Sequence, residues 1–171
     1  MIRTTDRIAS RHPHDRGFAL LIAVVFMSVM LSFGLSLGSL AYKQAVLASG
    51  ATASQYAFYV ADAALECLLY ADQRQNLFAY PASAPASAPA MTCDGSGPYS
   101  TPTFTYSPSQ FVVTTRLSLD SGRRCADVTI YKAALAGSVT YLFSQGFDAP
   151  CATVVSPAGA RYVSRGLKAQ Y

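Results

Sequence analysis

The longest apolar stretch of the chain runs from Phe18 to Tyr42 and contains no charged side chain. Arg16 and Gly17 precede it, and Lys43 follows it. About 20 apolar residues in a helix cross the hydrocarbon core of a bilayer, so this stretch predicts a membrane-spanning helix. A secretory signal peptide has an apolar run of about 7 to 15 residues and a cleavage site with small residues, and neither is present here. We therefore expect the helix to remain in the mature chain.

Helical periodicity continues past the apolar stretch, because no proline occurs between Lys43 and Asn76. Small and apolar residues recur there at spacings of four, three and four, at Ala57, Ala61, Ala64 and Leu68. This spacing places them on one face of a helix. The two parts together predict one helix of about 60 residues, roughly 90 Å long at 1.5 Å per residue. Its second half, 43–80, is amphipathic and needs a covering layer.

The pattern changes at a segment rich in Pro, Ala and Ser, 81–100. The repeat PASAPASAPA at 81–90 offers no side chains for a core and predicts an exposed linker of polyproline character. Its serines are candidate attachment points for O-linked glycan, although a plain spacer is the simpler interpretation.

Residues 101–171 alternate between apolar and polar side chains, as half-buried strands do. The alternating positions are Phe111, Val113, Thr115, Leu117 and Leu119, then Ala126, Val128 and Ile130, then Val139, Tyr141 and Phe143, and more weakly residues within 161–171. Strands joined by short turns predict an antiparallel sheet of about four strands, with its apolar face on the amphipathic half of the helix. The expected fold class is therefore α+β.

Small residues also recur inside the apolar stretch. Gly34 and Gly38 form the small-x3-small pattern that lets helix backbones approach closely in apolar surroundings. Glycine is also common in membrane helices without such a contact, so both interpretations stay open. Each glycine lowers helix propensity by about 1 kcal/mol, so the helix would stretch or melt most easily here.

The net charge of +4 arises partly in the first sixteen residues, where four arginines outnumber two aspartates. Positive residues beside a membrane helix stay in the cytoplasm, which predicts a cytoplasmic segment 1–17 and an exported chain from Lys43 onward. No stripe of Lys and Arg with interleaved aromatic residues indicates a nucleic-acid groove, so we expect no nucleic acid among the partners.

Four cysteines lie on the exported side, at spacings of 26, 32 and 26 residues: Cys67, Cys93, Cys125 and Cys151. An even number in an oxidising compartment favours two disulfides, and the close cysteine pairs of a zinc site are absent. Four cysteines allow three pairings, and the sequence alone does not choose among them. We prefer Cys67 with Cys93 and Cys125 with Cys151, since each bridge then closes a local loop and stabilises by roughly 3 kcal/mol.

The sequence offers little for catalysis. Both histidines, His12 and His14, precede the membrane helix, so they cannot join a Ser-His-Asp or Cys-His arrangement in the exported part. Asp62 and Glu66 share a helix face, but a solvated face or arginine partners explain them more simply than acid–base chemistry. The aspartates of the sheet region lack the ligand spacing of a calcium loop. We expect binding or scaffolding, not an enzyme, with no cofactor and no metal.

The junction Arg16-Gly17-Phe18-Ala19-Leu20-Leu21 resembles the class III leader junction of type IV pilins and pseudopilins. In that family prepilin peptidase cleaves after the glycine and methylates the new N-terminal phenylalanine. The resemblance implies a leader 1–17, cleavage between Gly17 and Phe18, and N-methylation of Phe18. The family's long N-terminal helix, half of it packed on an antiparallel sheet with a disulfide near the C-terminus, is similar to the predicted layout. Residues 57–66 also resemble the A-F-x-A-A-E-A-A-L stretch of PilX-like minor pilins.

One position departs from the family pattern. Major pilins carry a glutamate at the fifth residue of the mature chain, which neutralises the amino terminus of a neighbouring subunit, and here that position is Ile22. Without the carboxylate a charge stays unpaired in an apolar core, which is costly, so such a subunit should dock poorly onto an existing tip. The resemblance therefore implies a minor subunit that lies at the tip or initiates assembly.

These features predict a structural minor subunit of a type IV pilus. The implied partners are other pilin subunits, prepilin peptidase and the assembly platform of the inner membrane. The chain would cross the inner membrane once, with a cytoplasmic N-terminus, before assembly, and would lie in the extracellular pilus afterwards. A pseudopilin of a type II secretion system is an alternative within the family. A single-pass anchored periplasmic or extracellular binding domain outside any filament is another, and it would not be cleaved after Gly17.

Overall fold

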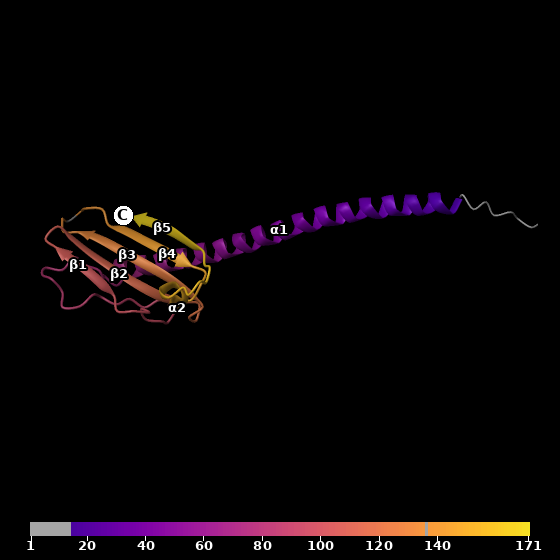
Figure 1. Cartoon of the computed structure of the whole chain (residues 1–171). Coiled ribbons are helices and arrows are strands. Elements are labelled where there is room, and N and C mark those ends of the chain that lie inside the picture. Colours follow the sequence, from indigo (N-terminus) through magenta and orange to yellow (C-terminus); the bar gives the residue numbers. More distant parts are fainter. Residues whose placement is uncertain (1–14, 136) are drawn as a thin grey trace, which may run out of the picture. The chain divides into compact units, whose positions relative to one another are not determined.

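The computed structural model describes residues 15–135 and 137–171. The chain divides into two compact units at Leu47 and Ala48, and helix α1, Asp15–Gln73, contributes to both. The second unit contains β1 Thr103–Ser107, β2 Gln110–Leu119, β3 Arg124–Ala133, β4 Tyr141–Phe147, α2 Cys151–Val155 and β5 Ser164–Gln170 (Figure 1). Each unit is described by itself below, and most of the expected leader lies outside the described residues.

Helix α1 is one uninterrupted helix of 59 residues, in line with the absence of proline. It ends at Gln73 and not near residue 80. The backbone amides of Arg74 and Gln75 both donate to the carbonyl oxygen of Tyr70, which closes the last turn. Asn76 then adopts a φ of 52°, and asparagine tolerates this left-handed conformation, which commonly follows a helix end.

The five strands form one antiparallel sheet in the order β1-β2-β3-β4-β5, so each strand pairs with its neighbours in sequence. The sheet and the helix packed on it make an α+β fold, as the sequence predicted. Strand β1 was not predicted. Its Phe104 and Tyr106 do alternate with polar residues, but the strand is short and directly follows the segment rich in Pro and Ser. In the structure Phe104 pairs with Val113, and Tyr106 with Phe111.

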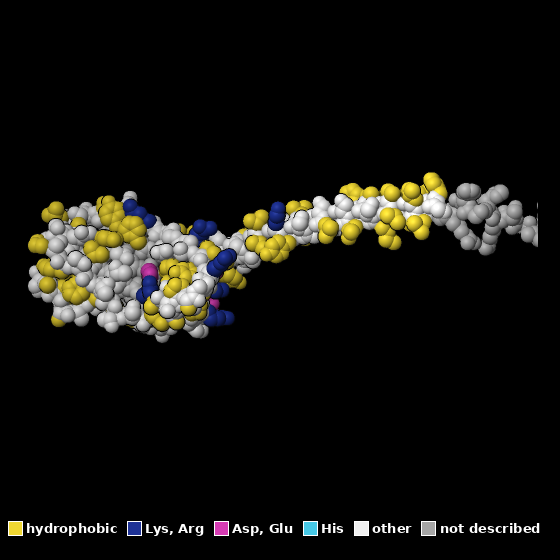
Figure 2. Space-filling model, in the orientation of Figure 1, with side chains coloured by type: hydrophobic (Ala, Val, Ile, Leu, Met, Phe, Trp, Pro, Cys, Tyr) yellow, Lys and Arg dark blue, Asp and Glu magenta, His cyan; other side chains and the backbone are white. Residues whose placement is uncertain are grey.

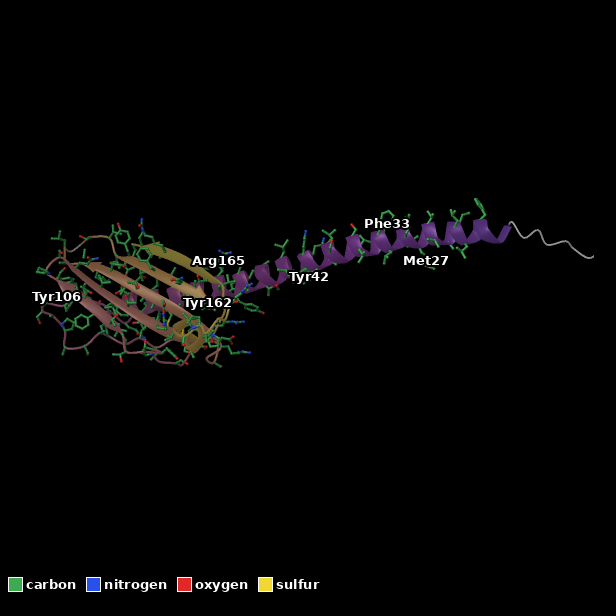
Figure 3. The ribbon with its side chains drawn as sticks, viewed as in Figure 1. Met27, Phe33, Tyr42, Tyr106, Tyr162 and Arg165 are labelled. Carbon is green, nitrogen blue, oxygen red and sulfur yellow. A yellow bond between two sulfur atoms is a disulfide. The ribbon has the colours of Figure 1, made fainter. Side chains whose placement is uncertain are left out.

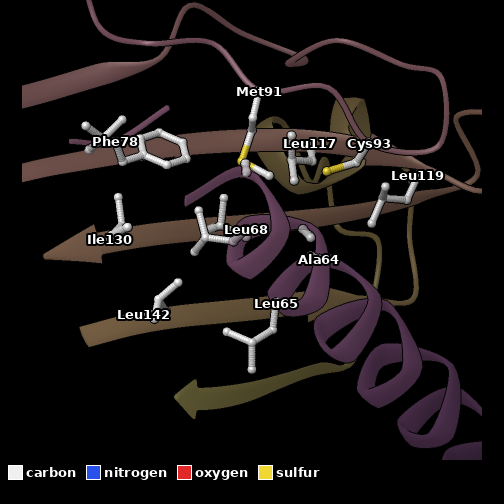
Figure 4. Close-up of a cluster of buried hydrophobic side chains, with 14 of the residues drawn as sticks. Ala64, Leu65, Leu68, Phe78, Met91, Cys93, Leu117, Leu119, Ile130 and Leu142 are labelled. Atoms are coloured by element: carbon white, nitrogen blue, oxygen red, sulfur yellow. The ribbon is translucent and has the colours of Figure 1, made fainter. Parts of the chain in front are cut away.

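The core lies between the sheet and the sheet-packed part of α1 (Figure 4). Ala57, Ala61 and Ala64 are fully buried, and Leu68 is nearly so, which makes the predicted stripe the buried face of the helix. The sheet contributes inward-facing residues of the central strands, including Val113, Leu117, Val128, Ile130 and Leu142.

Strand β4 faces the other way from the apolar alternation in its sequence. Tyr141 and Phe143 are 37% and 40% exposed, whereas Leu142 and Ser144 are buried. The reason is the close approach of α1. A Cβ atom on Gly146 would lie 2.2 Å from the carbonyl oxygen of Ala57, so only small side chains fit on the inner face there.

The segment between α1 and β1 has no regular structure, but it is fastened to the sheet unit at both ends. Phe78 and Met91 are both buried in the core, and Tyr80 donates a hydrogen bond of 2.7 Å to the carbonyl oxygen of Ser107. Desolvation, together with the adjacent phenol of Tyr106, raises the pKa of Tyr80. The expected linker therefore runs over the surface of this unit, with most of 81–90 exposed.

Candidate functional site

The longest exposed apolar surface of the described residues is the apolar part of α1, residues 18–42. Every residue of this stretch is exposed, and hydrophobic side chains lie along it (Figure 2). Met27 and Phe33 project from different sides of the helix and are 73% and 64% exposed (Figure 3). Within the described residues one helix is long and apolar enough to cross a membrane, and it is this one.

The backbone polar groups of this stretch and two of its four serine hydroxyls are paired inside the helix. Its backbone amides and carbonyls bond along the helix, and the hydroxyls of Ser28 and Ser39 donate to the carbonyl oxygens of Val25 and Ser36 at 2.8 and 2.9 Å. A helix whose polar groups are paired internally enters an apolar environment without leaving unmade hydrogen bonds. The whole surface is therefore compatible with lipid or with other apolar helices.

The residues expected at the leader junction lie at the beginning of α1. Gly17 is helical, and Phe18 is exposed beside it. Phe18, Leu21, Ile22 and Val25 line a groove without polar surface, so the fifth residue after the expected cleavage point is apolar among apolar neighbours. Apart from the neighbouring turns of the helix itself, no described atom lies within 4 Å of a Cβ placed on Gly34 or Gly38, so the helix backbone is open to close approach at both positions. Cleavage, methylation and packing at these residues stay predictions.

The four cysteines form two disulfides, with the pairing we preferred from the sequence. Cys67 of α1 bonds to Cys93 in the irregular segment, and Cys125 of β3 bonds to Cys151 of α2. Cys125 and Cys151 lie in a second, smaller buried cluster with Phe147, whereas Cys67 is half-buried. The first bridge fastens the irregular segment to the helix, and the second fastens α2 to the sheet.

The outer face of the sheet has a shallow hollow of about 440 Å³, whose lining includes Asp127, Phe143, Gln145 and Lys168. The side chains of Asp127, Gln145 and Lys168 in this lining already have partners. Both carboxylate oxygens of Asp127 accept hydrogen bonds of 2.6 Å from Arg116, which raises the pKa of the guanidinium. The amide of Gln145 donates to Ser164, and the Lys168 ammonium lies 4.6 Å from the centre of the Tyr141 ring.

The sequence interpretation missed this outer face, because the aromatic alternation of β4 was taken as part of the buried face.

Within the described residues, the remaining carboxylates do not form a cluster. Asp62 and Glu66 are both exposed on α1, and no group of three acidic, His or Cys residues that could hold a metal occurs in the described ranges. His12 and His14 lie outside those ranges.

One ion pair inside the sheet unit fixes the end of α1. The ammonium of Lys132 on β3 lies 2.7 Å from a carboxylate oxygen of Asp72, whose side chain is almost fully buried. Neither carboxylate oxygen has hydrogen-bond geometry with a donor in the described chain, so the attraction is mainly between charges. Because a buried carboxylate is costly without its cation, the pair favours the arrangement in which Asp72 lies beside Lys132 of β3.

Comparison with known proteins gives no match, whether to a family model, to a curated protein or to a solved structure.

Proposed function

We propose that this chain is a structural minor subunit of a type IV pilus, cleaved after Gly17 by prepilin peptidase and methylated at Phe18. The observation that carries the proposal is the exposed apolar surface of 18–42, joined in one helix to a segment that packs on an antiparallel sheet. Apolar surface of this extent needs a bilayer or other apolar helices around it. The helix of a pilin lies in the bilayer before assembly and among the apolar helices of other subunits afterwards, in the filament core.

The mechanism of such a subunit is packing. The apolar stretch buries against equivalent helices of other subunits, and Gly34 and Gly38 offer the places where backbones approach most closely. The sheet unit stays in solvent outside the membrane, where an oxidising compartment keeps both disulfides closed.

The apolar groove around Ile22 supports a role at the tip or in initiation. A subunit that joins an existing filament brings its amino terminus next to the subunits already there, and Ile22 supplies no carboxylate to neutralise a neighbour's charge. The first subunit has no earlier amino terminus to neutralise. This subunit therefore enters first, before the assembly platform of the inner membrane adds the major subunits.

Mass spectrometry of the mature N-terminus, combined with analysis of sheared filaments, tests the proposal. We expect a chain that begins with N-methylated Phe18 and is present in small amounts in the filament fraction. Gly17→Ala should leave the leader attached. Gly50→Ala is the matched control, because Gly50 is also a helical glycine with no atom within 4 Å of an added Cβ, and it should be processed normally. An uncleaved wild-type chain would refute the proposal.

The same exposed helix also suits a single-pass anchored binding domain, which is the second candidate. That protein would keep residues 1–17, stay in the membrane fraction and be absent from sheared filaments. A type II secretion pseudopilin would be cleaved at Gly17 like a pilin, but its deletion would abolish protein secretion and leave surface pili intact.

A further inference from the structure

The PASA repeat, residues 81–90, forms two equivalent structural units. The chain bends at 82–83 and again at 86–87, so the bends repeat with the same period as the sequence. In both units the proline, Pro81 or Pro85, is half-buried and the serine, Ser83 or Ser87, is exposed. The prolines therefore lie against the sheet unit, and the two serines face solvent in the same way.

The two hydroxyls are the reactive groups of this segment. All other residues of 81–90 are alanine or proline, which carry no functional group in the side chain. Neither Ser83 nor Ser87 forms a side-chain hydrogen bond within 15–135 and 137–171, so both hydroxyls are free to react. The alanines on either side of each serine leave room for an enzyme to reach it.

The segment is also held in place, and it contains no helix or strand. Phe78 and Met91 anchor its two ends in the core, and the disulfide from Cys67 to Cys93 closes the loop. Proline prevents helix formation and removes backbone donors, so the segment keeps an irregular backbone outside any helix or strand, which a modifying enzyme can bind. Segments rich in Ser and Pro of this kind carry O-linked sugar in exported proteins.

We propose that Ser83 and Ser87 are O-glycosylation sites, each carrying a sugar on its side-chain oxygen. The donor is a sugar activated by a phosphate linkage to a lipid or a nucleotide. The serine Oγ forms a bond to the anomeric carbon, the bond from that carbon to the phosphate oxygen breaks, and the phosphate leaves with the electron pair. The hydroxyl proton passes to a base of the transferase. The preference for sugar over phosphate rests on the proposed export of this unit, because an exported segment meets no ATP.

The experiment is mass spectrometry of the full-length chain, produced from its own gene in the organism that encodes it. No Lys or Arg occurs in 75–115, so after reduction of the disulfides trypsin releases the repeat in one peptide that ends at Arg116, and electron-transfer fragmentation locates any added mass. We expect one sugar-mass increment on each of Ser83 and Ser87. Ser83→Ala and Ser87→Ala should each lose one increment, whereas Ser100→Ala, a nearby exposed serine outside the repeat, should lose none.

Each possible result either supports or overturns the glycosylation proposal. A bare repeat, a phosphate mass, or sugar located elsewhere in the peptide overturns the proposal, and sugar on one serine alone overturns the assignment of the other. The alanine variants should unfold at the wild-type temperature, since both serines are exposed and unbonded. The same digest contains the N-terminal peptide, which tests the pilus proposal separately. A peptide that begins at Phe18 together with a bare repeat overturns only the glycosylation, and an uncleaved N-terminus with a glycosylated repeat overturns only the pilus role.

Discussion

Replacing Gly146 by alanine would place a Cβ atom 2.2 Å from the carbonyl oxygen of Ala57 and 2.4 Å from the amide nitrogen of Ala61. Both are backbone atoms of α1, so no flexible side chain can move aside. An ordinary contact between carbon and oxygen is about 3.3 Å, so the helix has to retreat from β4 by about 1 Å. The variant therefore separates the two layers at their closest point.

The expected loss of stability follows from the packing of the buried face of α1. A gap of about 0.5 to 1 Å forfeits a quarter to a half of the dispersion energy, and a buried leucine makes about 40 to 60 contacts of about 0.1 to 0.2 kcal/mol each. Leu68, which is 1% exposed, lies two turns beyond the clash at Ala61, so its gap is about 0.5 Å, and a quarter of its energy is about 2 kcal/mol. When the smaller losses at the neighbouring Ala64 and Leu65 are added, we expect the free energy of unfolding to fall by about 3 kcal/mol. This is the upper end of the usual range for overpacked cores.

Gly166→Ala on the adjacent strand β5 is the matched control. A Cβ there would meet only Ser144, at 3.8 Å, which is an ordinary contact, so we expect a change within about 0.5 kcal/mol. The chain has no Trp and 11 Tyr, so thermal unfolding of the full chain in detergent can be followed by tyrosine near-ultraviolet circular dichroism. A loss of about 3 kcal/mol lowers the midpoint by roughly 10 °C. Equal midpoints for the two variants would refute the close contact between α1 and β4.

Three further results are expected. Dithiothreitol followed by alkylation should open the bridge of half-buried Cys67 before that of fully buried Cys125, and Cys125→Ser should cost roughly 3 kcal/mol in urea unfolding; the reverse order of reduction would contradict the burial. Lys132→Met leaves the buried carboxylate of Asp72 unpaired and should cost about 3 to 5 kcal/mol, part of which is recovered by adding Asp72→Asn; no recovery would argue against the ion pair. Because the pKa of Tyr80 is raised by desolvation above its ordinary value of about 10, the neutral phenol stabilises the fold below that pH, and this contribution is lost as the pH rises through the raised value. The stability of Tyr80→Phe should therefore fall less above about pH 10 than that of the wild type, as measured by urea unfolding at several alkaline pH values. An equally steep fall of stability with pH in both proteins would contradict this.

Local patterns in the sequence were sufficient for the long helix, four of the five strands and the buried stripe of α1. Proline-free spacing of three and four identifies the stripe because residues at that spacing share one helix face whatever they pack against. The preferred disulfide pairing came from loop length alone, and the structure brings the same cysteines together. The apolar stretch and its leader-like junction are likewise runs of consecutive residues, so both can be recognised in the sequence alone. The proposed function rests on them for this reason.

The structure alone decided which residues meet across the two layers. Alternation in β4 predicted a strand, but its buried face depends on the distance to α1, and Gly146 sets that distance through contacts with residues far away in the sequence. The ion pair between Asp72 and Lys132 likewise joins positions that no local pattern connects. The PASA repeat looked like a free linker because its composition cannot form a core, yet Phe78 and Met91 on either side of it are buried in one. Periodicity shows which residues share a face, whereas only the packed chain shows what that face touches.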